Sequence, residues 1–217
     1  MKIFQILLGC SAAALITTAP MAMAQSWEVG GGVGGGFYTS QDVTSPYGSA
    51  SAKLQTGLAG GVWLGNNLHS SHWSGELRYE YQMGDLALSS GGTTATMDAH
   101  TQQFHYDVVW HATASESRIR PYVAAGAGIK LYQGTGAQVA YQPLSNIALL
   151  TQQQDLTPLV SAGAGVKFQM SHHLQLRLDV HDYLTPFPKN VITPNIGAKA
   201  GGWLQDIVPM IGISYTN

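Results

Sequence analysis

Apolar and polar side chains alternate residue by residue between Trp73 and Gln82, and this alternation limits the possible folds more than any other feature. The two parities hold, in turn, Trp73, Gly75, Leu77, Tyr79 and Tyr81, and Ser74, Glu76, Arg78, Glu80 and Gln82. Because successive side chains of a β-strand point to opposite faces, this strand has one apolar face and one polar face. An α-helix of the same sequence would have no apolar face.

Eight segments with this tendency follow one another, each about 9 to 13 residues long, as a tilted membrane-spanning strand requires. They cover residues 27–38, 52–64, 73–82, 101–111, 120–132, 158–170, 174–183 and 207–215. Short connections at 65–72, 112–119 and 171–173 alternate with long ones at 39–51, 83–100, 133–157 and 184–206. Outer-membrane barrels have short periplasmic turns and long extracellular loops. The pattern therefore predicts an all-β fold, an eight-stranded antiparallel up-and-down transmembrane β-barrel with both ends in the periplasm.

The face that would point into the barrel carries the charged residues. Its predicted members form a lumen network of Glu28, Lys53, Glu76, Arg78, Glu80, His105, Asp107, Lys130, Lys167, Arg177 and Asp179. Without the histidine, five of these residues are cationic and five are anionic. An eight-stranded barrel has room only for its own side chains, and buried charges are costly unless they are paired. We therefore expect a plugged lumen filled with ion pairs, and not an ion-selective channel.

The opposite face is apolar and would contact lipid, for example at Leu54 and Leu58. Aromatic residues gather near both ends of this face, as they do at the two interfaces of a membrane. One predicted girdle holds Trp27, Trp73, Trp110, Phe168 and Tyr215, and the other holds Phe37, Tyr81 and Phe104. Trp63 falls on the inward parity and departs from this pattern.

The N-terminal residues have the features of a secretory signal. Lys2 precedes an apolar run from Ile3 to Ile16, and Ala22-Met23-Ala24 offers the small residues that a signal peptidase needs. We therefore predict a signal peptide at 1–24, cleaved on export through the inner membrane, and an outer-membrane β-barrel domain at 25–217.

Three stretches resemble those of the small OmpA-like and OmpW-like outer-membrane barrels. Arg120-Pro121-Tyr122-Val123, with the Ala- and Gly-rich run to Gly128, is similar to a strand of that superfamily. Asp182 to Phe187 is similar to a segment that leads into a loop in the same superfamily, and Ile211 to Tyr215 to its C-terminal β-signal. The resemblance implies a barrel in the outer membrane of a Gram-negative-type envelope. It also implies two partners, the lipid bilayer and the barrel-assembly machinery.

Composition and motifs give no sign of a cofactor, a metal or a nucleic acid. Charged residues are 10% of the chain and the formal net charge is −2, which offers no basic surface. The glycines from Gly30 to Gly35 match the letters of a phosphate-binding loop, but no helical pattern follows them. The histidine pairs His69/His72 and His172/His173 lack neighbouring ligands of metal-site spacing. Cys10, the only cysteine, lies within the predicted signal peptide.

The favoured function is non-enzymatic, a structural or surface-interaction role with an unidentified surface ligand. The resemblance allows one alternative, a narrow conduit for small hydrophobic molecules. Less favoured are a soluble lipocalin-type barrel and an outer-membrane enzyme that modifies lipid or cleaves peptides. Rim residues for such an enzyme would be Asp85, Asp98, His100 and Asp182, while His105 and Asp107 share one face without an evident serine partner.

The long connection 133–157 carries an apolar patch, Ile147-Ala148-Leu149-Leu150, that a fully solvated loop would not need. Exposed apolar patches mark contact sites. This patch therefore either binds a partner or extends the next strand or folds back over the mouth of the barrel.

Overall fold

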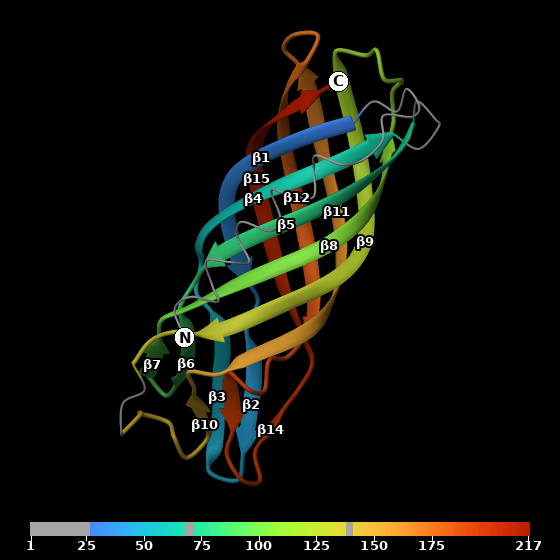
Figure 1. Cartoon of the computed structure of the whole chain (residues 1–217). Coiled ribbons are helices and arrows are strands. Elements are labelled where there is room, and N and C mark those ends of the chain that lie inside the picture. The colour runs from blue at the N-terminus through green and yellow to red at the C-terminus, as the bar shows by residue number, and fades with distance from the viewer. Residues whose placement is uncertain (1–26, 68–71, 138–140) are drawn as a thin grey trace.

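The computed structural model describes residues 27–67, 72–137 and 141–217. Within them, eight strands close into a barrel in which each strand pairs antiparallel with its neighbours (Figure 1). These strands are β1 (Trp27–Tyr38), β4 (Gly57–Asn67), β5 (Trp73–Met83), β8 (Ala99–His111), β9 (Ile119–Gly134), β11 (Gln154–Gln169), β12 (Leu174–Pro186) and β15 (Trp203–Thr216). Pairing of β1 with β15 closes the cylinder. The predicted fold class is confirmed.

The barrel has two different ends, which we call the turn end and the loop end. Short connections join β4 to β5, β8 to β9 and β11 to β12 at the turn end, where β1 begins and β15 finishes (Figure 1). The four long connections emerge at the loop end. The predicted signal peptide, 1–24, lies outside the described residues. Among the described residues, no helix is long and apolar enough to cross a membrane.

The two faces of the barrel wall differ in polarity as the alternation predicts. Outward side chains are apolar and exposed, as at Val33 (65%) and Leu58 (73%). Inward side chains are buried, and they include nearly all the charged residues of the barrel strands, as at Arg78 (1%) and Glu80 (0%), beside a smaller apolar group that includes Leu159 and Val208. A soluble lipocalin-type barrel would have the reverse arrangement, with its apolar residues inside and its charges in water. This arrangement rules out that alternative.

The long connections are not irregular loops but form a second layer of short strands, which we call the cap (39–56, 84–98, 135–137, 141–153 and 187–202). Its strands are β2 (Gln41–Ser45), β3 (Gly48–Leu54), β6 (Leu86–Ser90), β7 (Thr93–Met97), β10 (Ala148–Leu150), β13 (Ile192–Pro194) and β14 (Lys199–Ala200). Five of them form a sheet in the order β14-β2-β3-β6-β7, and β10 pairs with β13.

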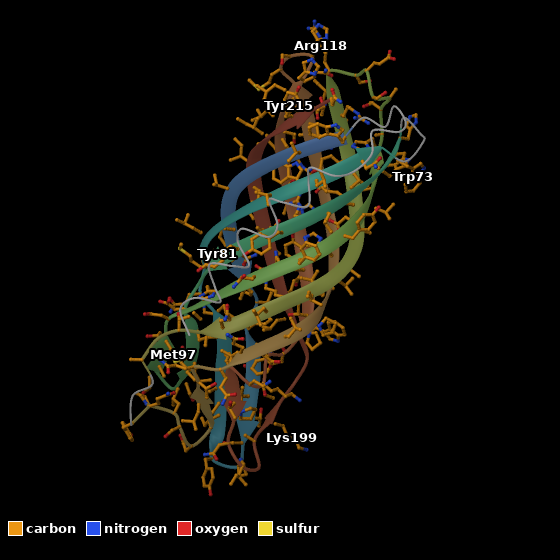
Figure 2. All side chains as sticks on the ribbon, in the orientation of Figure 1. Trp73, Tyr81, Met97, Arg118, Lys199 and Tyr215 are labelled. Carbon is orange, nitrogen blue, oxygen red and sulfur yellow. The ribbon has the colours of Figure 1, made fainter. Side chains whose placement is uncertain are left out.

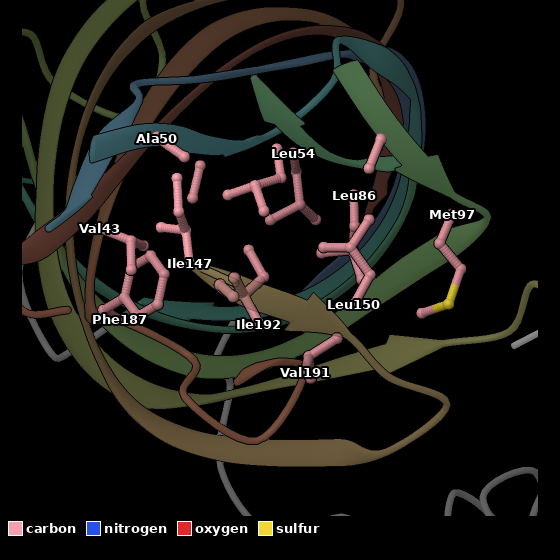
Figure 3. Close-up of a cluster of buried hydrophobic side chains, with 14 of the residues drawn as sticks. Val43, Ala50, Leu54, Leu86, Met97, Ile147, Leu150, Phe187, Val191 and Ile192 are labelled. Atoms are coloured by element: carbon pink, nitrogen blue, oxygen red, sulfur yellow. The ribbon is translucent and has the colours of Figure 1, made fainter. Parts of the chain in front are cut away.

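The cap has a hydrophobic core of its own, to which all four long connections contribute. Figure 3 shows Leu54, Ile147 and Ile192, from three different connections, turned toward one another. Leu86 and Leu88 come from the remaining connection, between β5 and β8, and are fully buried in the same cluster. Burial of apolar side chains stabilises a fold in proportion to the area removed from water. The connections are therefore held as one packed unit.

This core corrects three predictions about residues near the loop end. Residues 52–64 are not one strand, because the chain leaves β3 after Leu54 and enters the barrel only at Gly57. Lys53 pairs with Ala87 in the cap and its side chain is exposed, so it does not belong to the lumen. Leu54 faces the cap core instead of lipid.

The apolar patch at Ile147 to Leu150 folds back into the cap. Ile147, Ala148 and Leu150 are each at most 3% exposed. The patch is therefore part of the internal packing, and its interpretation as a binding surface is wrong.

Candidate functional site: the filled lumen

The interior of the barrel holds the densest group of ionisable residues among those that the structure describes. Ten of the predicted lumen residues point inward and are buried or nearly so: Glu28, Glu76, Arg78, Glu80, His105, Asp107, Lys130, Lys167, Arg177 and Asp179. The eleventh, Lys53, is exposed in the cap, as described above. The inward members come from β1, β5, β8, β9, β11 and β12. Six of the eight barrel strands therefore contribute these charged or titratable side chains to the lumen.

Two arginines form the centre of this network. Arg78 on β5 donates to Glu76 (2.9 Å), Glu80 (3.0 Å) and Asp179 (3.0 Å). Arg177 on β12 donates from Nε to Asp179 (2.7 Å) and through both terminal nitrogens to Glu76. The planar guanidinium suits this role because its five donors can serve several carboxylates at once. Glu76 and Asp179 each bind both arginines, which joins opposite walls of the barrel.

Trp63 lies inside the barrel, against these arginines. Its ring centroid is 4.8 Å from Cζ of Arg177 and 5.2 Å from Cζ of Arg78, and its Nε1 donates to Ser214 (3.0 Å). A guanidinium over an indole face gains electrostatic and dispersion energy. The space is left by glycine, because a Cβ on Gly30 would overlap the indole. Trp63 therefore points inward because it packs against the lumen arginines.

A second cluster lies nearer the loop end and includes residues that the sequence pattern did not single out. Lys130 Nζ donates to Asp206 (2.5 Å) and stands 4.7 Å from the ring centroid of Tyr38. Asp206 lies in the predicted connection 184–206, because the alternation that predicts the last strand begins only at residue 207. Tyr132 bonds to Thr185 (2.6 Å) at the same level. These side chains occupy the lumen directly below the cap core, which also includes Tyr132 and Leu204.

His105 and Asp107 lie beside a serine that was not evident in the sequence, Ser161 on β11. His105 Nδ1 is 3.0 Å from Asp107 Oδ1, and Ser161 Oγ donates to that same oxygen. A nucleophilic serine would instead have to bond to the histidine that takes its proton. His181 Nε2 approaches the other Asp107 oxygen at 3.4 Å. All four side chains are buried, so the group is arranged as a packed polar cluster.

The predicted aromatic girdle residues lie on the outer wall. At the turn end, Trp73 pairs with Trp110 across β5 and β8, and the Trp27 and Tyr215 rings stand 5.9 Å apart. Phe168 also lies at this end, one residue before the end of β11. Phe37 and Tyr81 lie toward the loop end. Phe104 lies near the middle of β8, away from the girdle position predicted for it. Figure 2 shows Trp73 and Tyr215 near the turn end and Tyr81 toward the loop end.

Two of the rim residues proposed for an enzyme, His100 and Asp182, lie on strands that are not neighbours. His100 on β8 stacks on Tyr81 with ring centroids 5.1 Å apart. Asp182 on β12 accepts a hydrogen bond from Gln205 (2.7 Å). β9 and β11 lie between β8 and β12 in the barrel, which separates these two residues. Among the described residues, which do not include His69, no group of three metal-binding side chains is present.

Comparison with protein families agrees with this architecture. Residues 10–198 match the model of the outer membrane protein beta-barrel domain. The chain belongs to this family. Membership of an outer-membrane barrel family supports a location in the outer membrane, with the exposed apolar wall in contact with the lipid bilayer.

Solved outer-membrane barrels share the fold at very low sequence identity. Neisserial surface protein A is 8% identical with a TM-score of 0.51, and the alignment covers 88% of this chain and 96% of that one. Ail of Yersinia pestis is 9% identical with a TM-score of 0.50, covering 90% and 100%. The outer membrane protease OmpT of Escherichia coli is 9% identical with a TM-score of 0.51, covering 91% and 99%. No curated protein matches. Since these neighbours include an attachment protein and a protease, the likeness establishes the fold and not the activity.

Proposed function

We propose that this outer-membrane barrel is a non-enzymatic protein that holds a rigid cap at the cell surface for structural or adhesive contacts. The observation that carries the proposal is the packed core of the cap. Loops that merely connect strands are polar and mobile, whereas this chain fixes its four long connections together with one buried side chain or more from each: Leu54, Leu88, Ile147 and Ile192. A fixed surface binds with a smaller entropic cost than a flexible one.

The filled lumen supports this role over that of a conduit. Arg78, Arg177 and Trp63 occupy the axis of the barrel with bonds to several strands. A permeating molecule would have to break these buried ion pairs, which are costly to separate. The cap core then covers the loop end of the same cylinder.

The tip of the cap offers an exposed contact surface. Tyr47 in the β2–β3 turn is 75% exposed, and Ile196 before β14 is 95% exposed. Pairing of Thr44 with Lys199 holds the two turns side by side. Large apolar side chains on a rigid support are typical anchors of protein interfaces. Ail was crystallised in complex with the heparin analogue sucrose octasulfate, whereas the exposed large hydrophobic side chains at the tip of this cap, Tyr47 and Ile196, carry no charge.

The experiment compares cells that produce the unmodified protein, a Tyr47→Ser/Ile196→Ser variant and a Val33→Ala variant. We expect the tip variant to lower attachment to cultured epithelial cells or to sister cells. Val33→Ala, on the outer wall of the barrel, serves as the control and should leave attachment to both kinds of cell unchanged. Equal attachment of cells that produce the unmodified protein and of cells that lack it would refute the proposal. So would release of fatty acids from lipid or cleavage of peptides by the refolded barrel.

A further inference from the structure

A chain of polar side chains lies on the outer wall of the barrel, where most neighbouring positions are apolar. We call it the outer polar ladder, and it consists of Tyr79, Tyr81, His100, Gln102 and Gln133. These residues share the outward parity of β5, β8 and β9 with the exposed Phe104, Val108 and Ile129. They do not contribute to the lumen or to the cap.

Hydrogen bonds connect the ladder across three strands. Tyr79 Oη donates to Gln102 Oε1 (3.0 Å), and Gln102 Nε2 donates to Gln133 Oε1 (2.9 Å). His100 Nε2 is 2.8 Å from the same oxygen of Gln133. The imidazole of His100 lies nearly parallel to the ring of Tyr81, with 28° between the planes. The ladder is therefore an ordered surface in which each member fixes the next.

The position of the ladder is the boundary between the lipid-facing wall and the loop end. His100 is the second residue of β8, and Gln133 is one residue before the end of β9. Amide groups are unfavourable in hydrocarbon, so this level of the wall belongs among lipid headgroups. Figure 2 shows Tyr81 on the flank of the barrel, toward the loop end and away from Trp73. A ligand of the ladder is thus a molecule whose polar part lies in the membrane interface.

The free hydrogen-bonding groups of the ladder indicate the chemistry of that ligand. Gln133 Oε1 accepts the bonds from Gln102 and His100, which leaves its amide protons available, and Gln102 keeps one amide proton. Tyr79 Oη and Gln102 Oε1 keep lone pairs for accepting bonds. Outward positions of β5, β8 and β9, strands that the structure describes in full, carry no lysine or arginine. Mixed donors and acceptors without cationic charge suit hydroxyl groups better than phosphate, which in its ionised form mainly accepts.

We propose that the outer polar ladder binds the sugar headgroup of a glycolipid in the leaflet around the loop end. The hydroxyl groups of the sugar bond to the amides of Gln102 and Gln133. The apolar face of the ring lies on the Tyr81–His100 stack. The acyl chains lie along the apolar wall, against residues such as Phe104. The same membrane anchors the lipid and positions its headgroup, so a weak contact is sufficient for enrichment.

The experiment measures which lipid remains with the purified barrel. The whole protein is folded into phosphatidylcholine vesicles that contain digalactosyldiacylglycerol, phosphatidic acid or neither, and then extracted in mild detergent. Mass spectrometry gives the retained lipid per barrel. We expect the digalactosyl lipid to be enriched several-fold over its share of the vesicle, and phosphatidic acid not to be enriched. Free digalactose at the same concentration as the lipid should not displace it.

Variants decide whether the ladder is the site. Gln102→Leu/Gln133→Leu should lose the enrichment, and His100→Phe, which keeps the aromatic stack, should reduce it. Gln205→Leu is the matched control, because Gln205 is another hydrogen-bonded amide near the loop end, on β15. Electrophoretic mobility before and after heating shows whether each variant is folded, and His100→Phe decides the question if the double variant does not fold. Equal enrichment in the control and the folded ladder variants overturns the proposal, as does preference for phosphatidic acid, competition by free digalactose, or absence of enrichment in the unmodified barrel.

Discussion

At the scale of single residues, the lumen shows how a small barrel accommodates charge. Arg177 is buried among Glu76, Asp179 and Tyr122, and its guanidinium lies over the Trp63 ring. Nε donates to both Tyr122 and Asp179, the two terminal nitrogens donate to Glu76, and the indole covers one face of the group. Removing one cation from such a cluster leaves carboxylates that are buried and no longer compensated.

We therefore expect Arg177→Met to lower the free energy of unfolding by about 3–5 kcal/mol, because Glu76 and Asp179 lose a shared cation. Urea unfolding in liposomes, followed by tryptophan fluorescence, measures this loss. Arg118→Met, at an exposed turn-end position, is the control and should have little effect. A similar stability for both variants would show that the lumen charges do not need one another.

The sequence identified most charged members of the lumen, because burial forces ionisable groups to one parity of each strand. It did not identify Asp206 or Ser161. Asp206 lies near the start of β15, where the alternation is hard to separate from a loop, and Ser161 is a small polar residue of no special pattern. Pairing between strands that are distant in sequence, such as Lys130 with Asp206, is set by the register of the closed barrel, which the alternation alone does not give.

At the scale of elements, the cap is what the sequence pattern missed. Its strands are short, from two to seven residues, so a period of two hardly repeats before the strand ends. β4 begins at Gly57, a position that only glycine fits because a Cβ there would overlap the backbone of Met83. Apolar residues in polar connections, such as Ile147 and Leu150, were the one signal of a second core.

The cap and the barrel should respond separately to mutation. Leu88→Ala removes a fully buried side chain from the cap core, and such changes cost about 2–5 kcal/mol. We expect trypsin to cut the variant in liposomes at Lys189 or Lys199 much faster than the unmodified protein. The heat-dependent gel shift of the barrel should persist. Loss of that shift along with the cap would show that the two layers form one cooperative unit.

The wall strands lead to a prediction that depends on depth. Leu178 on β12 points outward and pairs with Val166 and Ile211, well inside the strand. An arginine on the lipid face costs about 2–4 kcal/mol near the midplane and about 1 kcal/mol or less near an interface. Leu178→Arg should therefore impair folding into liposomes far more than Leu184→Arg near the loop end. Equal folding yields for the two variants would contradict the assignment of this face to lipid.

At the scale of the whole molecule, the barrel is obstructed twice, by the ion-pair network and by the cap core. Refolded protein in planar bilayers should give no large, steady single-channel currents, because the side chains of Arg78 and Arg177 occupy the axis. Removing the cap alone should not create a pore, since the network would remain. Stable currents from the unmodified protein would refute the plugged lumen and favour the conduit.

Pairing of β2 with β14 has a consequence for the order of assembly. β2 follows the first barrel strand and β14 precedes the last one, and the neighbouring Thr39 and Gln205 are hydrogen-bonded where β1 meets β15. The pairing that completes the cap sheet therefore lies next to the pairing that closes the cylinder. In a chain whose barrel is still open, the core around Val43, Leu88 and Ile192 would be incomplete. Its exposed apolar side chains would make such a chain prone to aggregation. A complete cap sheet thus requires the last barrel strand to be in place, which couples the cap to the closure of the barrel.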